Sequence, residues 1–307
     1  MRMVKARIAV VGSYAVGLSM RTIRAPGPGE TVEGNEFAEF HGGKGSNQAV
    51  GCARLGAETT FLACIGNDSA GDKAVSLYET EGVGTNSVIR HPTLPTAVGF
   101  IIVDQAGENQ IAVDFGANRA LHPTDVEAHR EIIQASDGVL VQMEIPPETA
   151  MAAMRVGRES GVITVLNPAP YQPTESGWEN VDVITPNQSE ARLILGLAPD
   201  SDAQPRDLAD GIREKGVGAV VMTLGAEGAF IASDSFTGAV PGQPVDVVDT
   251  TGAGDAFAAA ITTALAEGSE LLDAVGFAVV AGSLAVTKYG VISALPYRSD
   301  IDRRLDR

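Results

Sequence analysis

Hydrophobic positions along the chain alternate between short apolar runs and longer amphipathic segments. The apolar runs, typical of strands buried on both faces, are RIAVVGS (7–13), TTFLACIG (59–66), GVLVQME (138–144), GVITVLNPAP (161–170), VDVITPN (181–187) and VGAVVMTLG (217–225). The segments with helical periodicity are SNQAVGCARLG (46–56), PPETAMAAMRVGRESG (146–161), QSEARLILG (188–196) and PRDLADGIREKG (205–216). This alternation predicts an α/β fold, with a mostly parallel sheet covered by helices and a ligand site beyond the carboxyl ends of the strands.

Two stretches have a different period. Residues 31–40 alternate polar and apolar side chains, and so do residues 97–104 and 110–114 on either side of the turn-forming QAGEN. Alternation with period two is typical of a sheet with one face in water. We therefore predict one domain, residues 1–307, with a small β lid inserted from about 14–41 and 96–115. Trp178 lies in a stretch typical of a surface loop.

Composition excludes some function classes. The 307 residues carry a net charge of −17, which disfavours a nucleic-acid partner because such proteins usually present a basic face. Apolar runs stay short of the ~18 residues that a membrane span needs, and the basic start MRMVKARIAVVGS favours a first strand over a signal peptide. Cys52 and Cys64 lack metal-site spacing and indicate reduced core thiols in a cytoplasmic protein.

The segment VVDTTGAGDAFAAA (247–260) carries the first candidate chemistry. Its Gly-rich turn opens an Ala-rich helix near Asp255, so the backbone N–H groups of Gly252, Ala253 and Gly254 can hold an anion. A resident anion would be repelled by Asp255. A carboxylate could instead take a proton from an attacking hydroxyl while the N–H groups stabilise a transferring phosphoryl group. The alternative is an ordinary helix start whose acidic residue is favoured by the helix dipole.

A second Gly-rich loop, GGKGSNQAVGCARLG (42–56), leads into a helix from near Ser46. It is not the Walker A pattern GxxxxGK[ST], which the chain lacks. Its exposed backbone, with Lys44 and Asn47 projecting from it, suits hydrogen bonds to a hydroxyl-rich ligand.

Together the two loops resemble the signatures of the ribokinase/pfkB family of carbohydrate kinases, and the resemblance covers nearly the whole chain. The motifs in family order are PGETVEG (28–34), GGKGSNQA (42–49), ACIGNDSAG (63–71), GAN (116–118), LVQMEIP (140–146), LNPAP (166–170), ITPNQSE (184–190), TLGAEG (223–228), DTTGAGDAF (249–257) and AVTKYG (285–290). LNPAP and VQME favour the ribokinase branch over the fructose-phosphate kinases. The resemblance implies a ribokinase-like fold and ATP-dependent phosphorylation of a sugar hydroxyl, on a pentose or ketohexose.

The resemblance also implies a role for each matching residue. The general base would be Asp255, and the anion hole would be Gly252, Ala253 and Gly254. The sugar would be held by Gly42, Gly43, Asn47 and Glu144, with Lys44 nearby. The ATP site would use Asn187, Thr223, Gly225 and Gly228, and Glu190 would hold Mg²⁺ through water. A K⁺ loop would be formed, largely through backbone carbonyls, by Asp249, Thr251, Ala285, Lys288 and Gly290. The lid would also form a homodimer contact.

The chain departs from the family at several positions. In GSYAVGLSM (12–20), Ala15 and Gly17 stand where the family usually has an Asn and an Asp that bind sugar hydroxyls. We therefore expect ribose to be a poor substrate. Candidate substitutes from the same pocket or lid are Tyr14, His41, Arg21 and Arg24. Val279 replaces a polar residue beside the adenine, and Ala294 replaces a Ser near the cation loop, so base preference and K⁺ dependence are also open.

Three other functions stay open at this point. The small Ala15 and Gly17 would make room for a nucleoside. Arg21 or Arg24 would bind the carboxylate of an acid sugar, as in a ketodeoxygluconate-type kinase. A catalytically silent sugar or nucleotide sensor belongs to another class, but it would have no need to keep Asp255 and the GAG turn.

Overall fold

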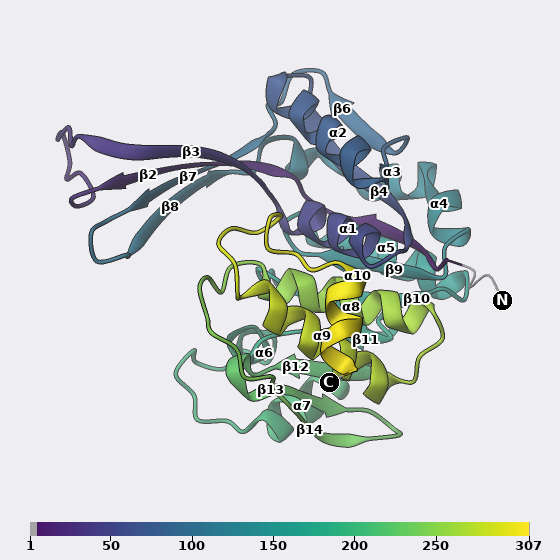
Figure 1. The fold of residues 1–307 in the computed structure, drawn as a ribbon. Helices are drawn as coiled ribbons and strands as arrows, with labels where there is room; N and C mark the ends of the chain where they lie inside the picture. Colours follow the sequence, from purple (N-terminus) through teal and green to yellow (C-terminus); the bar gives the residue numbers. More distant parts are fainter. Residues whose placement is uncertain (1–4, 307) are drawn as a thin grey trace.

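The computed structural model describes residues 5–306. Its main sheet has the order β14-β13-β12-β11-β10-β9-β1-β4-β5, with β6 paired to β4 (Figure 1). The strands are β1 (Arg7–Val11), β4 (Glu58–Gly66), β5 (Val83–Gly84), β6 (Val88–His91), β9 (Gly138–Gln142), β10 (Ile163–Asn167), β11 (Val183–Ile184), β12 (Ala219–Thr223), β13 (Gly228–Ala232) and β14 (Thr237–Pro241). All pairings are parallel except β12–β13 and β13–β14, which are antiparallel. The predicted, mostly parallel sheet is confirmed.

A smaller sheet of four strands, the lid sheet, extends away from this body (Figure 1). Its order is β3-β2-β7-β8, and its strands are β2 (Ala15–Thr22), β3 (Gly34–Gly42), β7 (Ala97–Val103) and β8 (Asn109–Asp114). β2 pairs antiparallel with β3 and parallel with β7. β3, β7 and β8 come from the two stretches with period-two alternation, so that pattern correctly predicted a second sheet with exposed residues. β2 lies outside those stretches, although inside the expected lid bounds 14–41.

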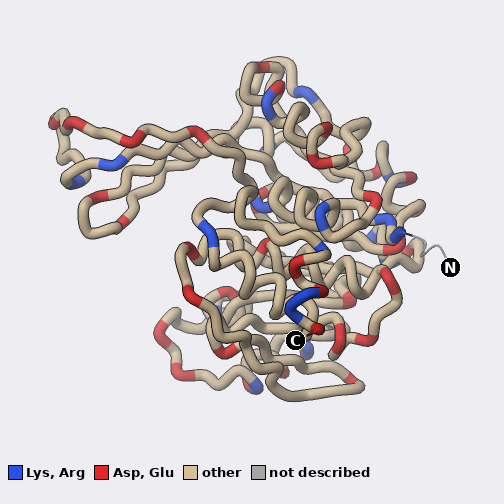
Figure 2. Tube along the Cα trace, in the orientation of Figure 1, with Lys and Arg blue, Asp and Glu red and all other residues tan. Residues whose placement is uncertain are grey.

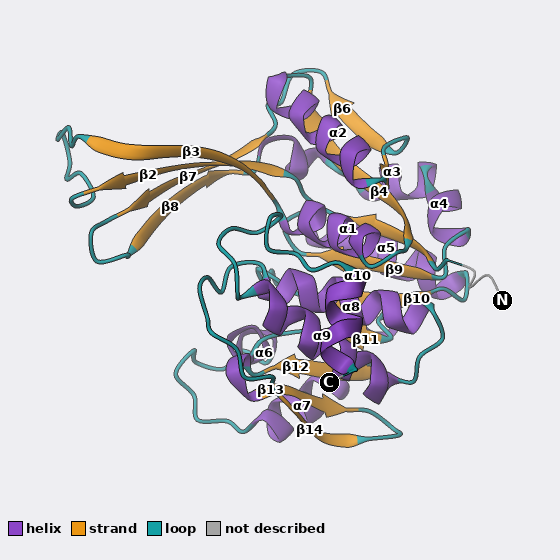
Figure 3. Ribbon diagram, in the orientation of Figure 1, coloured by secondary structure: helices purple, strands orange, loops and turns teal. Residues whose placement is uncertain are grey.

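Helices cover both faces of the main sheet (Figure 3). One face carries α1 (Lys44–Arg54), α2 (Ser69–Glu81), α8 (Ala253–Ala266), α9 (Leu271–Ala285) and α10 (Arg298–Leu305). The other carries α3 (Pro123–Ala128), α4 (Arg130–Gln134), α5 (Pro147–Glu159), α6 (Gln188–Ile194) and α7 (Pro205–Arg213). Three short 3₁₀ turns are η1 (Gly116–Ala120), η2 (Trp178–Asn180) and η3 (Gly225–Glu227). Strand residues alternate between the two resulting cores, so the runs are apolar throughout.

Three sequence expectations need correction. The helix expected from near Ser46 begins at Lys44, and the one expected near Asp255 begins at Ala253. Both start directly after a glycine with positive φ, which ends the preceding loop earlier than the apolar pattern indicated. Trp178 is buried, because η2 packs its indole against the core around α5. A polar neighbourhood in sequence therefore hid a core residue.

Acidic residues are spread over the lid sheet and the body, with Lys and Arg interspersed (Figure 2). Many of these charges form ion pairs at the surface, such as Arg155 with Glu159 and Arg298 with Glu267. Among residues 5–306, no helix combines the length and the apolar character that a membrane crossing requires.

Candidate active site

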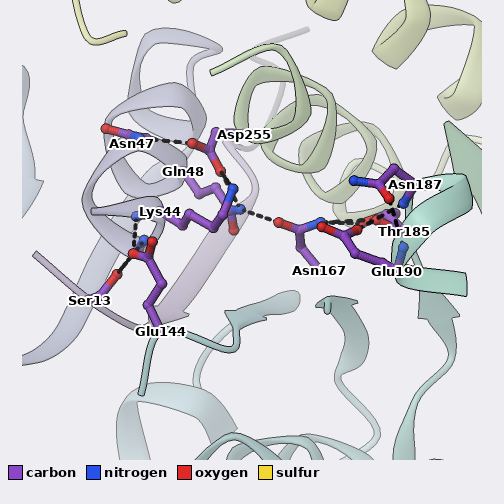
Figure 4. Close-up of polar contacts among 11 residues, drawn as sticks. Ser13, Lys44, Asn47, Gln48, Glu144, Asn167, Thr185, Asn187, Glu190 and Asp255 are labelled. Carbon is purple, nitrogen blue, oxygen red and sulfur yellow. Dashed lines mark hydrogen bonds and ion pairs between the residues drawn. The ribbon is translucent and has the colours of Figure 1, made fainter. Parts of the chain in front are cut away.

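Asp255 lies in the first turn of α8, and its side chain is almost fully buried. One carboxylate oxygen accepts a hydrogen bond from Asn47 Nδ2 at 2.8 Å, and the other accepts one from Gln48 Nε2 at 2.9 Å. Lys44 Nζ is 3.9 Å from Oδ1 (Figure 4). All three partners come from the N-terminal end of α1. The helix that follows the 42–45 loop therefore orients the carboxylate that follows the 252–254 turn.

The first turn of α8 leaves backbone N–H groups available beside this carboxylate. Gly252 caps the helix at φ 81°, and a Cβ there would lie 2.6 Å from Val291 Cγ1, so only glycine fits. The N–H of Ala253 makes a long contact of 3.4 Å to the carbonyl of Thr250. Gly254 faces open space, with no atom within 4 Å of a Cβ built on it. The turn therefore has room for an anion at the positive end of a helix of fourteen residues.

The first turn of α1 is organised by Glu144, which follows β9. Its Oε2 accepts hydrogen bonds from Lys44 N at 2.8 Å and from Ser13 Oγ at 2.5 Å. Gly43, the N-cap, has φ 86°, and a Cβ there would lie 2.6 Å from the backbone of Tyr14. Glycine is therefore required where the loop passes over the end of β1. Glu144 thus accepts the first N–H of α1 with Oε2 and ties it to Ser13.

Several buried polar atoms at this position have no partner among the described residues. They include Asn47 Oδ1 and Gln48 Oε1, on the same amides that donate to Asp255. A buried polar atom without a hydrogen bond is costly, so these oxygens indicate a site for donors such as ligand hydroxyls or water. The predicted sugar-binding residues Asn47, Glu144 and Lys44 are therefore brought together beside the predicted base.

A chain of buried amides connects this site with the next one along the sheet. Gln48 Nε2 also donates to Asn167 Oδ1 at 3.0 Å, and Asn167 Nδ2 donates to the carbonyl of Thr185 at 2.9 Å. Asn167 ends β10 and Thr185 follows β11, so neighbouring strand ends carry the chain. Figure 4 shows it running from Asp255 toward Asn187 and Glu190.

Asn187 and Glu190 form a reciprocal cap at the start of α6. Asn187 Oδ1 accepts from Glu190 N at 2.8 Å, and Glu190 Oε2 accepts from Asn187 N at 2.8 Å. Burial raises the pKa of Glu190, and the charge of Asp255 adds to the effect, although the cap and Lys44 oppose it. The pKa of Lys44 is also raised, first by the charge of Asp255, and for a lysine this favours the charged form. A cation near Glu190 would offset the cost of its buried charge.

A cavity of about 890 Å³ opens beside the turn of Gly252, Ala253 and Gly254, called the anion-binding turn from its predicted role. It extends from Asn187 and Thr223 to Ala253 and Gly254. Gly225 and Gly228 form part of its wall, and a Cβ on Gly228 would lie 2.2 Å from the carbonyl oxygen of Val240. The apolar part of the lining is Leu224, Val245, Val247, Phe257, Val279 and Val286. A volume of this size accommodates a nucleotide, with apolar walls for a base and N–H groups for phosphates.

Comparison with known proteins identifies the family. The model of the pfkB family of carbohydrate kinases matches residues 5–298. The ribokinase of Haemophilus influenzae is 36% identical over 274 residues, covering 89% of this chain and 90% of that protein. A bifunctional ribokinase/ribose-5-phosphate isomerase A from Fructilactobacillus sanfranciscensis is 37% identical over 96% of this chain, which spans only 55% of that protein. A deoxyribokinase of Salmonella typhi is 31% identical, covering 94% of this chain and 95% of that protein.

The chain belongs to the pfkB family. Among solved structures, a ribokinase from Thermotoga maritima has a TM-score of 0.90 at 32% identity and covers 98% of this chain and 100% of its own. The Arabidopsis thaliana ribokinase complexed with ribose and ATP has a TM-score of 0.91 at 27% identity, covering 99% of this chain and 100% of its own. The predicted ribokinase-like fold and the predicted ATP-dependent carbohydrate kinase are confirmed.

The residues predicted for the family's cation loop lie on two adjoining segments. Asp249 accepts hydrogen bonds from Thr251 N at 2.9 Å and from Gly290 N at 3.1 Å. Although burial alone would raise the pKa of Asp249, these hydrogen bonds hold it below its ordinary value. Ala285 is buried at the end of α9, whereas Lys288 is exposed and borders a separate surface cavity with Ala294. Asp249, Thr251 and Gly290 are thus joined, and the roles of Ala285 and Lys288 through their backbone carbonyls stay predictions.

The candidate replacements for the missing sugar ligands do not gather at the site of Asn47, Glu144 and Asp255. Tyr14 is fully buried, and its hydroxyl forms a hydrogen bond with His41 Nδ1 at 2.9 Å. Arg21 pairs with Glu36 at 3.1 Å, and Arg24 pairs with Glu30, all on the lid sheet or the turn beyond it. Arg21 lies six residues along β2 from Ala15, or ~20 Å of extended strand. Arg21 and Arg24 therefore hold exposed ion pairs away from Ala15, and the buried Tyr14 hydroxyl is bonded to His41.

Sequence reasoning missed several residues that hold the site together. Ser13, Gln48 and Asn167 all lie inside quoted motifs, but their side chains had no assigned role. Asn118, in the GAN motif, accepts a hydrogen bond from Tyr14 N at 3.1 Å and donates one to the carbonyl oxygen of Tyr14 at 2.9 Å. These two bonds hold the chain directly before the lid sheet. The available signal was the amide side chains of Gln48 and Asn167, which lie inside motifs of the candidate site, since buried amides commonly orient ionised groups.

Proposed function

We propose that this chain transfers the terminal phosphoryl group of ATP to a hydroxyl of a free pentose or ketohexose. The observation that carries the proposal is Asp255, a buried carboxylate held by two amides at the junction of an anion-binding helix start and a nucleotide-sized cavity. Its relatives named ribokinase and deoxyribokinase support a pentose in particular.

In this mechanism the acceptor hydroxyl binds beside Asp255, within reach of Asn47 and Glu144. Asp255 takes the proton of that hydroxyl as the bond to phosphorus forms. The N–H groups at the start of α8, that of Gly254 and the weakly bonded one of Ala253, stabilise the negative charge of the transferring group, and Lys44 adds a positive charge nearby. ATP supplies the phosphoryl group, and the cavity walls orient it in line with the acceptor.

The residues present fit a magnesium ion bound with the nucleotide. Among residues 5–306 no three His, Cys, Asp or Glu side chains form a ready metal cage. Mg²⁺ commonly needs only one or two carboxylates besides phosphate oxygens and waters. Glu190, whose buried charge lacks a full counterion, and Asn187 would take this role through water. The proposal includes a K⁺ ion near Asp249 and Thr251. It also includes a homodimer formed through the lid sheet.

The test is a coupled ADP-release assay on the wild-type enzyme with a panel of pentoses, ketohexoses, acid sugars and nucleosides. We expect turnover that depends on Mg²⁺ and on a sugar, with ribose used poorly because Ala15 and Gly17 offer it no polar side chain. ADP release that is unaffected by every acceptor would contradict a kinase acting on these classes. The arginines available for an acid sugar are engaged on the lid sheet, so we expect acid sugars to be inactive.

A further inference from the structure

The two sides of β2 have different neighbours where the strand leaves the body. Tyr14 and Val16 point into the core that contains Tyr78 of α2, with the two tyrosine rings edge to face at 6.1 Å. Ser13 points the other way and donates to Glu144 in the acceptor site. Because successive side chains of an extended chain alternate, Ala15 and Gly17 follow Ser13 on the side of the acceptor site.

Phe40 occupies the space of a side chain at position 17. The two residues are directly opposite each other in the β2–β3 register, so they share a face. A Cβ built on Gly17 would lie 2.2 Å, 2.4 Å and 2.8 Å from three ring carbons of Phe40. Real Cβ contacts are not that short, so a larger residue at position 17 would have to displace the ring of Phe40, which now lies across the glycine. Gly17 itself is buried, and the ring is 38% exposed.

The strand on the other side of β2 continues this surface without adding a polar group. Ala15 is opposite Ala97 on β7, and Gly17 is opposite Gly99, which in turn is opposite Val113 on β8. The face beside the acceptor site is therefore small or apolar across all four strands. Polar partners come only from the body, where Asn47, Glu144 and Asp255 gather.

We propose that Phe40 determines acceptor specificity by closing the β2 side of the site with an apolar ring. The proposal rests on the proposed function and names the acceptor class more closely. It is a sugar that presents its hydroxyls to the body and turns a deoxygenated carbon or a C–H face toward Phe40. A hydroxyl on that side would lose its water without gaining a partner, so we expect it to lower kcat/KM by about tenfold or more.

The experiment compares D-ribose with 2-deoxy-D-ribose and 3-deoxy-D-ribose, which differ from ribose by one hydroxyl. Wild type should use one of the deoxy sugars at least about tenfold better than ribose. Phe40→Ala should shift that ratio toward ribose by about tenfold. Phe40→Ala combined with Gly17→Asp should shift the ratio further, because the cleared space then holds a carboxylate that can accept a hydrogen bond from a sugar hydroxyl.

Phe37→Ala is the matched control. Phe37 lies on the same strand and is 63% exposed, but it is three residues from Phe40, at the register shift of the β2–β3 pair, so it does not lie opposite Gly17. The control should leave the ratio unchanged. Oligomeric state is measured by light scattering for every variant, since Phe40 is exposed enough to contact another chain.

The outcomes separate the two levels of the argument. If wild type phosphorylates no acceptor, the proposed function fails. If it turns over sugars but prefers ribose, or if Phe40→Ala leaves the deoxy-to-ribose ratio unchanged, the role of Phe40 is overturned and the function stands. An equal loss on all sugars, accompanied by a change of oligomeric state, would likewise overturn it, because Phe40 would then be an assembly contact.

Discussion

The α/β body and the lid sheet hold their polar groups in opposite ways. In the body, buried hydrogen bonds join residues far apart in sequence, as from Asn47 and Gln48 to Asp255, about two hundred positions away. On the lid sheet, charged side chains form exposed ion pairs with near neighbours, as in Arg21 with Glu36. The buried network of the body fixes the Asp255 carboxylate by two amides, whereas the lid sheet leaves its ion pairs exposed to water.

This difference separates chemistry from selection. Breaking one member of a buried network leaves its partners unsatisfied, at ~1–3 kcal/mol each, whereas an exposed ion pair is worth only ~0–1 kcal/mol. Changes in the body should therefore damage the reaction with any acceptor. Changes on the lid sheet should alter which acceptor is used while the reaction itself continues. The predictions below test this separation, beginning with the largest effect.

Asp255→Asn should reduce kcat by ~10²–10⁴, because the amide cannot accept the acceptor's proton. The site should otherwise persist. Asn47 and Gln48 each have an amide oxygen without a partner, so they can rotate to receive the new NH₂ group. The measurement is steady-state kinetics, together with calorimetric binding of ATP and of the best sugar found. A kcat within about tenfold of wild type would remove Asp255 from the role of base.

Gln48→Leu should lower kcat by about tenfold to a hundredfold for every acceptor used, with little change in the KM for ATP. Leucine keeps the volume but donates to neither Asp255 nor Asn167, so the carboxylate loses one of its two amide partners. Gln134→Leu, at an exposed position at the end of α4, is the matched control and should have wild-type kinetics. An effect on one sugar alone would contradict the separation, since Gln48 would then act in selection.

Most of the body could be predicted from the sequence. Apolar runs flanked by amphipathic segments specify a parallel sheet, and the two Gly-rich loops follow because a backbone approaching a ligand requires glycine. Asp255, Asn47 and Glu144 could be placed together because the resemblance to the family assigns all three to the acceptor site. The start of each helix was missed by two residues, since the pattern of side chains does not reveal a glycine at positive φ.

The lid side could not be predicted to the same depth. The sequence shows that Ala15 and Gly17 lack polar groups, and from this an open space was expected. Only the cross-strand register reveals that Phe40 fills the space at Gly17, because the pairing of β2 with β3 joins residues on either side of a long turn. The burial of Tyr14 was hidden in the same way, since its partners Tyr78 and His41 come from other elements.

Potassium should stimulate turnover by a few-fold, less than a mutation in the buried network changes it. Asp249 ties Thr251 and Gly290 together directly before the anion-binding turn, so a cation there would stabilise the approach to α8. Ala294, which is buried and carries no side-chain oxygen, predicts a weaker dependence than a fully matched site. The assay compares K⁺ with tetramethylammonium at fixed Mg²⁺. Equal rates in the two salts would eliminate the cation site.

The smallest expected effect lies where the lid sheet joins the body. His41 is half-buried, and burial lowers the pKa of its imidazole, with Lys73 adding to the effect and Glu39 opposing it. Burial also raises the pKa of Tyr14, so its hydroxyl stays protonated and can donate across the 2.9 Å to His41 Nδ1 when the neutral ring carries its proton on Nε2. Protonation of His41 would remove that acceptor. The folded state therefore favours the neutral ring, and the bond is present above the unfolded pKa of ~6.5.

Stability should consequently fall as the pH drops from about 6.5 toward the lower pKa of the folded state, because the unfolded chain then binds the proton more readily. His41→Gln cannot take up this proton, so the difference in Tm between wild type and this variant should narrow between pH 7.5 and pH 5.5. The shift corresponds to about 2–4 °C for each kcal/mol. A His41→Gln difference that does not depend on pH would show that the junction of lid and body holds without the neutral ring.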